Sequence, residues 1–203
     1  MKELIHHLTS DEVAGWCDVE KGNVLYDLVH TYDASTVVEI GTFGGRATSV
    51  FALALKSLGR GIVFGIDPWE KQACLEGVND VANDEYWSNM DWKSLVKGYF
   101  DIFQKYDLLQ YHAHLRKKDE DCLKYFADGS IDILHIDSNH SEELACQTVH
   151  LWWPKVKLGG IVVMDDINWF GPLQAVGVMK EYGVKTLGEY DNSKCCFGVY
   201  QKI

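Results

Sequence analysis

Residues 36–45, TVVEIGTFGG, are the most informative stretch of the sequence. Their β-branched and apolar side chains predict a buried strand, and the glycines at its end predict a tight turn into an apolar helix over 46–58. The next apolar stretch, GIVFGIDP at 61–68, predicts a second buried strand that its proline ends. A strand, a helix and a second strand in this order are typical of a parallel sheet.

The same alternation of strands and helices continues to the C-terminus. Further helices are expected at 11–17, 20–32, 91–106, 120–127, 141–153 and within 171–182, and further strands at 108–115, 131–137, 161–166, 184–190 and 195–202. No helix separates the last two strands, which we therefore expect to pair antiparallel at one edge of the sheet. The sequence thus predicts an α/β fold with a seven-stranded sheet, in which five strands are parallel and helices cover both faces.

The composition is that of one ordinary globular domain. Of the 203 residues 47% are hydrophobic and 24% charged, and we expect a single domain over 1–203 with N-terminal helices in 1–35. The net charge of −11 argues against a nucleic-acid partner. The apolar runs are too short to cross a membrane, and the start of the chain lacks a signal-peptide pattern, which predicts a cytoplasmic protein. The six cysteines have no metal-binding spacing and are expected to be reduced thiols.

Ligands of parallel sheets bind beyond the carboxyl ends of the strands, so the residues there are the first functional candidates. The glycine turn at 41–45 has the spacing G-x-x-G-G, which differs from the dinucleotide-binding pattern G-x-G-x-x-G. Such a turn lets a ligand approach the backbone closely, although a glycine turn without any ligand is the alternative. Asp67 ends the second strand, where a carboxylate can accept both hydroxyls of a ribose; a surface aspartate before a proline is the alternative.

Three carboxylates follow the fourth and fifth strands. Asp137 ends the fourth strand, and Asp165 and Asp166 end the fifth. If these strands are neighbours, their backbones lie about 4.8 Å apart, and three like charges so close together need a counter-charge. A Mg²⁺ ion would supply it, because this cation prefers oxygen ligands. The alternatives are that one of these aspartates caps the following segment or that the carboxylates share a proton.

The motifs VVEIGTFGG, IDP, DILHIDSNHS and GGIVVMDDINW, in this order, resemble those of the class I S-adenosylmethionine-dependent methyltransferases. Within that class the chain is similar to the metal-dependent small-molecule O-methyltransferases of the catechol, caffeoyl-CoA and macrocin types. The resemblance implies a Rossmann-like fold, S-adenosylmethionine as cofactor, and a divalent cation such as Mg²⁺. It further implies the following sites: Glu39, Gly41 and Gly45 at the methionine part of the cofactor, Asp67 at its ribose, and Asp137, Asp165 and Asp166 at the metal.

The chain departs from the family pattern at three places. Where the family commonly has a serine after the glycine turn, this chain has Arg46-Ala47-Thr48, and near the adenine Lys118-Asp119 replaces Asp-Ser. A lysine acts as base three residues beyond the first metal aspartate in the catechol type, and this chain has His140 there. We therefore assign His140 and Asp137 to catalysis. The cofactor site is expected to include also Thr42, Thr48, Asp119 and Asp137.

Residues 69–90 are acidic and rich in Asn, and they leave the carboxyl end of the second strand. We interpret this insertion as a lid over the acceptor site. Trp69 and Trp169 follow strand-end acids, so their rings are candidates for a flat wall against the acceptor. His135, on the same strand as Asp137, is expected to be buried and hydrogen-bonded.

These residues together predict methyl transfer to a hydroxyl of a small molecule, such as a sugar, a vicinal diol or a phenol, with metal assistance. Three alternatives stay open: a metal-independent methyltransferase of the same fold, a NAD-dependent oxidoreductase, and a non-catalytic nucleotide-binding module. The glycine spacing disfavours the oxidoreductase, and the intact strand-end acids disfavour the non-catalytic module. The identity of the acceptor and the oligomeric state, a homodimer included, stay open.

Overall fold

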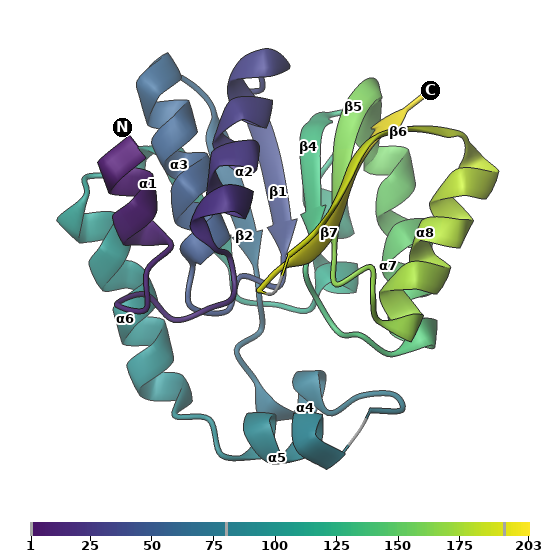
Figure 1. Cartoon of the computed structure of the whole chain (residues 1–203), viewed down its shortest axis with the longest axis horizontal. Coiled ribbons are helices and arrows are strands. Elements are labelled where there is room, and N and C mark those ends of the chain that lie inside the picture. The colour runs from purple at the N-terminus through teal and green to yellow at the C-terminus, as the bar shows by residue number, and fades with distance from the viewer. Residues whose placement is uncertain (1, 80, 193) are drawn as a thin grey trace.

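One seven-stranded sheet forms the centre of the molecule, as the computed structural model shows (Figure 1). The structure describes residues 2–79, 81–192 and 194–203. The strands are β1 (Thr36–Ile40), β2 (Ile62–Ile66), β3 (His112–Leu115), β4 (Ile131–Ile136), β5 (Val156–Asp165), β6 (Val184–Asp191) and β7 (Cys196–Lys202). Their order in the sheet is β3-β2-β1-β4-β5-β7-β6. The first five strands are parallel, and β7 pairs antiparallel with both β5 and β6. The predicted seven-stranded Rossmann-like fold is confirmed.

Helices cover both faces of this sheet. They are α1 (Lys2–Leu8), α2 (Val19–Thr31), α3 (Arg46–Leu58), α4 (Lys71–Cys74), α5 (Val81–Ser88), α6 (Trp92–Lys105), α7 (Glu142–Trp152) and α8 (Phe170–Tyr182), with short 3₁₀ helices η1 (Leu109–Tyr111), η2 (Asp119–Tyr125) and η3 (Trp153–Lys155). None of the helices within the described residues is both long and apolar enough to cross a bilayer.

Alternating side chains of the strands divide the core into two halves. On β1, Val37 faces one half and Val38 the other, and on β5 Val163 and Met164 divide in the same way. The first half is filled by α1, α2, α3 and α6, and the second by α7 and α8. Successive residues of a strand point to opposite faces of the sheet. Residues two positions apart on a strand therefore pack in the same half of the core, and adjacent residues pack in different halves. This rule also places the polar residues at the strand ends.

The N-terminal segment differs from its prediction. A helix was expected at 11–17, but the structure has α1 earlier in the chain and an irregular segment over 11–17. Gly15 has φ of +132°, which an α-helix does not allow. The carbonyl of Val13 accepts a hydrogen bond of 2.6 Å from the Arg46 side chain instead of one from a helix backbone. The second helix, expected over 20–32, is confirmed as α2.

Two other elements differ from their predictions, one in length and the other in helix type. The strand expected over 108–115 is β3 at 112–115 only, because η1 takes up the residues before it. The helix expected over 120–127 is the 3₁₀ helix η2. A short apolar run does not show whether the chain forms a strand, an α-helix or a 3₁₀ helix. The spacing of apolar residues distinguishes these structures only over a longer segment.

Residues 69–90 lie beyond the carboxyl ends of the strands, apart from the other helices (Figure 1). They contain α4 and α5, although the sequence showed no strong helical period there. Residue 80 of this predicted insertion lies outside the described residues. No residue of α4 or α5 is buried, so this segment has no core of its own.

The histidines of β3 make the stability of the fold dependent on pH. Burial lowers the pKa of both His112 and His114 to about 4, from the ordinary value of 6.5. The unfolded chain therefore binds protons between pH 6.5 and 4 that the folded chain does not bind, and stability falls as the pH falls through this window. We expect the free energy of unfolding to be lower at pH 5 than at pH 7 by about 1–2 kcal/mol for each histidine.

Urea unfolding at both pH values measures this effect. His112→Gln and His114→Gln should each flatten the pH dependence, whereas His6→Gln, which changes an exposed histidine, should leave it unchanged. The same pH dependence in parent and both β3 variants would contradict the prediction.

Candidate functional site

A cavity of about 460 Å³ lies at the carboxyl ends of the strands. It is lined by residues that follow β1, β2, β4 and β5, by the segment 15–17, and by α5. The strand order reverses between β1 and β4, because β2 and β3 lie on one side and β5 on the other. Such a switch point is where open parallel sheets bind their ligands.

Gly41 begins the floor of this cavity. Its φ of +84° suits glycine, and a Cβ added there would collide with the carbonyl oxygen of Asp137. The turn after β1 thus passes directly against the end of β4, and Thr42 continues along the cavity. Gly45 lies at the start of α3 rather than on the cavity wall, where its missing side chain makes room for the Tyr99 ring. We call this turn, together with the end of β4 that it touches, the cradle, and a side chain at 41 would force its two parts apart.

Asp67 is held in a fixed orientation at the end of β2. Its two oxygens accept backbone hydrogen bonds from Phe43 at 2.9 Å and from Trp69 at 2.8 Å. Burial raises the pKa of Asp67, and these backbone bonds oppose the rise. A carboxylate oxygen has two lone-pair positions, so each oxygen can accept a further hydrogen bond from a ligand hydroxyl. Asp67 lines the cavity as the sequence predicted.

Asp119 lies on the same wall, at the start of η2. Its Oδ2 accepts hydrogen bonds from Trp152 at 2.9 Å and from Thr148 at 3.3 Å, both on α7. Burial raises its pKa, and these two bonds oppose the rise. Asp119 lines the cavity, and its carboxylate is fixed by α7 rather than free to move.

Glu39, His135 and Thr48 form a buried polar chain across three elements. The Thr48 hydroxyl donates to Glu39, and His135 Nδ1 lies 3.0 Å from Glu39 Oε1. All three side chains are buried, which confirms the expectation for His135. Glu39 lines the cavity, whereas Thr48 lies behind Glu39 and does not itself line the cavity. Thr48 therefore supports Glu39, and a direct contact to a cofactor stays only a prediction.

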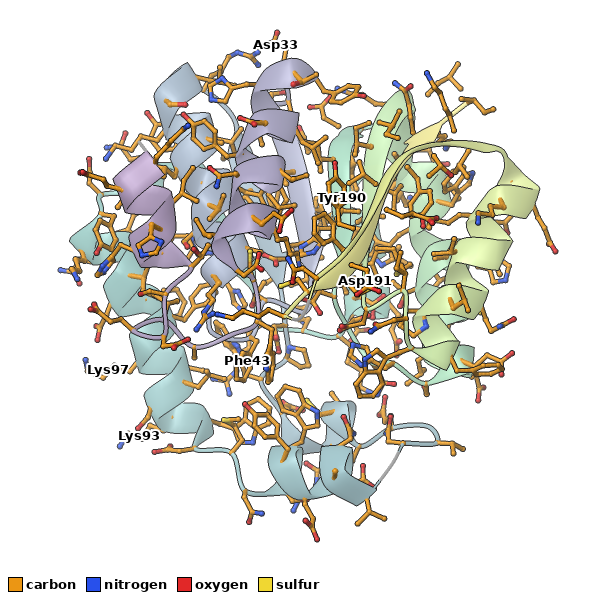
Figure 2. The ribbon with its side chains drawn as sticks, in the orientation of Figure 1. Asp33, Phe43, Lys93, Lys97, Tyr190 and Asp191 are labelled. Carbon is orange, nitrogen blue, oxygen red and sulfur yellow. The ribbon has the colours of Figure 1, made fainter. Side chains whose placement is uncertain are left out.

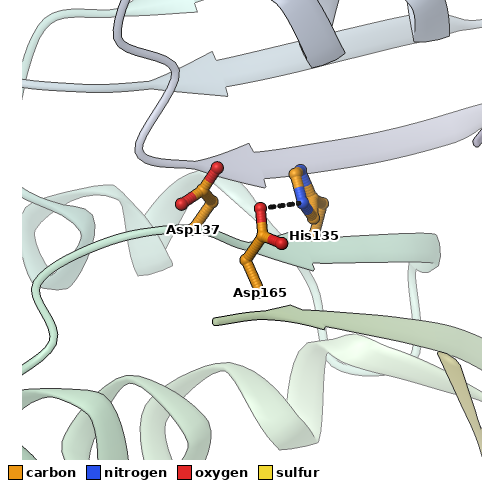
Figure 3. Close-up of side chains that lie close together, drawn as sticks. All are labelled: His135, Asp137 and Asp165. Atoms are coloured by element: carbon orange, nitrogen blue, oxygen red, sulfur yellow. Dashed lines mark ion pairs between the residues drawn. The ribbon is translucent and has the colours of Figure 1, made fainter. Parts of the chain in front are cut away.

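The three strand-end aspartates divide into two groups. Asp165 is the last residue of β5, and Asp166 follows it outside the strand with φ of +51°. One set of ligand atoms within 4.8 Å of one another comes from His135, Asp137 and Asp165, and the other from Asp137, His140 and Asp166. Figure 3 shows the first set, in which His135 Nε2 lies 3.5 Å from Asp165 Oδ2. The carboxylates of residues 137, 165 and 166 thus do not form the single group that we expected for Mg²⁺.

Lys21 is the functional candidate that the sequence reasoning missed. This residue of α2 is buried, and its ammonium pairs with Asp165 and lies 3.9 Å from Asp137. The spacing of residues along α2 indicated that Lys21 is buried. Lys21, Leu25 and Val29 are four residues apart, so they lie on one face of the helix, and all three are buried. A lysine on the apolar stripe of a helix needs a buried partner. The strand-end aspartates are that partner.

Opposing influences set the charge of this cluster. Burial alone would raise the pKa of Asp165, but the Lys21 ammonium and His135 hold it below its usual range. Burial would lower the pKa of Lys21, and Asp165 and Asp137 raise it. The pKa of Asp137 is raised by burial and by the neighbouring Asp165 charge. Burial and Lys21 lower the pKa of His135, yet its bonds to Asp165 and Glu39 outweigh them and raise it. Asp165 and Lys21 are therefore both charged near neutral pH.

His140 and Trp169 lie together at the cavity wall. His140 Nε2 is 3.1 Å from Asp166 Oδ2, and its ring centroid is 5.1 Å from that of Trp169. Both residues line the cavity, and Trp169 is 45% exposed, so its ring is available to a ligand. Trp69 is placed differently: its indole is buried, stacks on His114 and donates to the Phe43 carbonyl. Trp69 therefore belongs to the core under the turn and does not line the cavity as we expected for an acceptor wall.

An aromatic cluster joins α5 to the rest of the cavity. Trp16 stacks on Phe43 with centroids 5.0 Å apart, and Trp87 of α5 meets Phe43 edge-on at 5.4 Å. Tyr86 contacts Trp16 at 5.5 Å. Figure 2 shows Phe43 at the end of the sheet that faces α4 and α5. All four rings line the cavity, so the insertion contributes an aromatic wall to it.

Comparisons with known proteins agree with this geometry. A family model described as "Methyltransferase domain" matches residues 38–167, which include the last three residues of β1, the glycine turn and all three strand-end aspartates.

Solved structures share the fold over nearly the whole chain. The cofactor-bound protein Rv0187 from MTB is 15% identical with a TM-score of 0.70, covering 98% of this chain and 88% of its own. The O-methyltransferase TomG from Streptomyces achromogenes, in complex with SAM, is 15% identical with a TM-score of 0.68, covering 99% and 88%. The O-methyltransferase from Bacillus cereus in complex with SAH is 15% identical with a TM-score of 0.65, covering 98% and 88%.

Proposed function

The chain belongs to the methyltransferase-domain family, and on that premise we propose that it transfers a methyl group from S-adenosylmethionine to a hydroxyl of a small molecule. Family membership favours methyl transfer over the hydride transfer of an oxidoreductase. The O-methyltransferases among the similar folds support a hydroxyl as the acceptor. Sugars, vicinal diols and phenols are the acceptor classes that we consider.

The observation that carries this proposal is the cradle at the switch point of the sheet. Gly41 lets the turn after β1 pass directly against the end of β4 at the cavity floor, and Asp67 presents oriented oxygens to the same cavity. A ribose bound at Asp67 would donate its hydroxyls to this carboxylate. Asp119 lies further along the same wall, where we place the adenine end.

S-adenosylmethionine supplies an electrophilic methyl group on a positively charged sulfur. The protein has to align the acceptor oxygen, remove its proton and keep water out. We place the acceptor between His140 and Trp169, which lie at the wall away from Asp67. His140 would accept the hydroxyl proton, and the Trp169 ring would support a flat or apolar face of the acceptor.

The residues present fit a divalent cation poorly. Asp165 pairs with Lys21 and lies 3.5 Å from His135, and each set of possible ligands contains only two of the three aspartates 137, 165 and 166. We therefore derive no step through a metal, and of the two methyltransferase mechanisms the metal-independent one is favoured by the Lys21 contact.

Calorimetric titration with S-adenosylmethionine, S-adenosylhomocysteine and NADH tests the proposed cofactor. The parent chain should bind the first two and not the third. Asp67→Ala should weaken binding by at least about tenfold, because hydrogen bonds to a charged group are worth about 1.5–3 kcal/mol. Asp33→Ala, which removes an exposed aspartate at the opposite end of the sheet (Figure 2), is the matched control. Unchanged affinity in Asp67→Ala would remove this residue from the site, and tight NADH binding would contradict the proposal.

We further propose that residues 69–90 act as a lid, which the aromatic cluster holds closed. Trp87→Ala removes contacts to Phe43 and Trp16, and one aromatic pair is worth about 0.5–1.5 kcal/mol. Hydrogen exchange of the α5 amides should therefore become about two- to tenfold faster. Tyr125→Ala, which changes an exposed ring outside the cavity, should have no effect on α5. Protection of α5 equal to that of β1 in the ligand-free parent would contradict the lid.

A further inference from the structure

Lys21 is a buried charged residue to which the proposed function assigns no contact with cofactor or acceptor. Its side chain is 2% exposed, and its ammonium contacts the Asp165 carboxylate directly and lies 3.9 Å from Asp137. These are two of the three aspartates whose mutual repulsion led us to expect a divalent cation. A fixed positive charge is therefore already present where the carboxylates need one.

The structure holds Lys21 at this position from several sides. Asp18 caps α2 by accepting a hydrogen bond of 2.8 Å from the Lys21 backbone, and Asn192 in turn donates to Asp18 at 3.0 Å. The Lys21 ammonium lies 5.8 Å from the centre of the Phe197 ring on β7. The start of α2 is thus tied to the antiparallel end of the sheet, which places the Lys21 backbone beside the strand-end aspartates.

The alternation of side chains along β5 explains why Asp165 faces Lys21. Glu39 and His135 are register partners on β1 and β4, and they face the half of the core that α2 covers. Asp165 is two residues beyond Val163, so it points to the same half. Asp166 lies beyond the end of the strand, with φ of +51°, and pairs with His140 at 3.1 Å. Each of these carboxylates therefore has a basic partner from the protein itself.

We propose that Lys21 is the built-in cation of this site, and that the strand-end aspartates consequently hold no divalent ion. Lys21 acts through Asp165 and Asp137 and is a positioning residue. A cation at the set of Asp137, His140 and Asp166 would have to replace the direct His140–Asp166 contact by bonds to the ion and share Asp137 with Lys21. The inference rests on the proposed function in one respect, which is that methyl transfer takes place in this cavity. An acceptor then needs no pair of neighbouring oxygens to chelate an ion.

Titration with Mn²⁺, followed by the electron paramagnetic resonance of the free ion, tests this proposal without any acceptor or turnover. The parent chain should bind no Mn²⁺ at millimolar concentration. Lys21→Met removes the charge but keeps the length of the side chain, and it should bind Mn²⁺ at least about tenfold more tightly than the parent. Lys157→Met is the matched control, because it removes a lysine paired with Asp132 at the opposite end of the same two strands.

Stoichiometric Mn²⁺ binding by the parent chain would overturn the proposal, and so would a folded Lys21→Met protein with no gain in Mn²⁺ affinity. If Lys21→Met does not fold, the titration of the parent chain alone tests the proposal: no Mn²⁺ binding supports it, and stoichiometric binding rejects it. Calorimetry with S-adenosylmethionine is run beside it on the parent. Failure to bind this cofactor would overturn the proposed function and would leave the Mn²⁺ result standing.

Discussion

His140→Ala is expected to lower turnover by about 10²–10⁴-fold, the range for loss of a general acid or base. His140 lines the cavity, and its Nε2 lies 3.1 Å from Asp166 Oδ2. If Nε2 donates its hydrogen to this carboxylate, Nδ1 carries the lone pair that accepts the acceptor's proton. The effect should be large because Lys21 already neutralises Asp165 and a metal ion is not expected to acidify the hydroxyl.

Transfer of a radiolabelled methyl group to a panel of phenols, diols and sugars provides the measurement. Binding of S-adenosylmethionine to His140→Ala should stay near that of the parent, since we place this residue at the acceptor end of the cavity. His150→Ala is the matched control, because this exposed histidine of α7 contacts Tyr182 and does not line the cavity. Turnover of His140→Ala close to that of the parent would make His140 a structural residue.

The strand pattern could be predicted because it depends on local periodicity. The buried runs, the glycine turn and the absence of a helix between the last two strands gave the seven strands and the antiparallel edge. The sequence could not show that 11–17 is irregular, because the Arg46 contact to Val13 that shapes it joins residues far apart in the chain. Short elements such as β3 and η2 offered too few residues for a period to be recognised.

The positions of the strand-end acids followed from the fold, but their partners did not. Asp67, Asp119 and Glu39 line the cavity as expected, since the carboxyl ends of parallel strands meet at one edge. Asp165 and Asp166 fall into two different sets of possible metal ligands, each together with Asp137, and metal binding by these aspartates stays a prediction. Asp166 lies beyond the end of β5 with φ of +51°, a conformation that the strand pattern does not indicate.

Lys21 and Trp69 show the limit of assigning roles from sequence position alone. Lys21 was one charged residue of a helix, and only the spacing to Leu25 and Val29 marked it as buried. Trp69 follows the strand-end Asp67 directly, yet it turns into the core, where His114 and Tyr99 provide ring partners. Neither ring partner could be inferred from the neighbours of Trp69 in the chain.

Gly41→Ala should be the most damaging small substitution in the molecule. A Cβ at this residue would meet the backbone oxygen of Asp137, and φ of +84° is strained for alanine. Strain of this kind costs about 1–3 kcal/mol, and forcing atoms into a packed site costs about 1–3 kcal/mol more. We therefore expect the free energy of unfolding to fall by about 2–6 kcal/mol, which lowers the melting temperature by about 2–4 °C for each kcal/mol.

Thermal and urea unfolding of Gly41→Ala measure this loss, and Gly98→Ala on α6 is the matched control. A Cβ at Gly98 meets nothing within 4 Å, and alanine is the better helix former by about 0.5–1 kcal/mol, so this variant should be slightly more stable than the parent. The two glycine variants thus differ in the sign of their effect. Because the clash at residue 41 moves the end of β4 against the cradle, S-adenosylmethionine affinity should fall in Gly41→Ala and stay unchanged in Gly98→Ala. A Gly41→Ala protein with the stability and affinity of the parent would show that the turn can shift away from Asp137, and the cradle would then not be rigid.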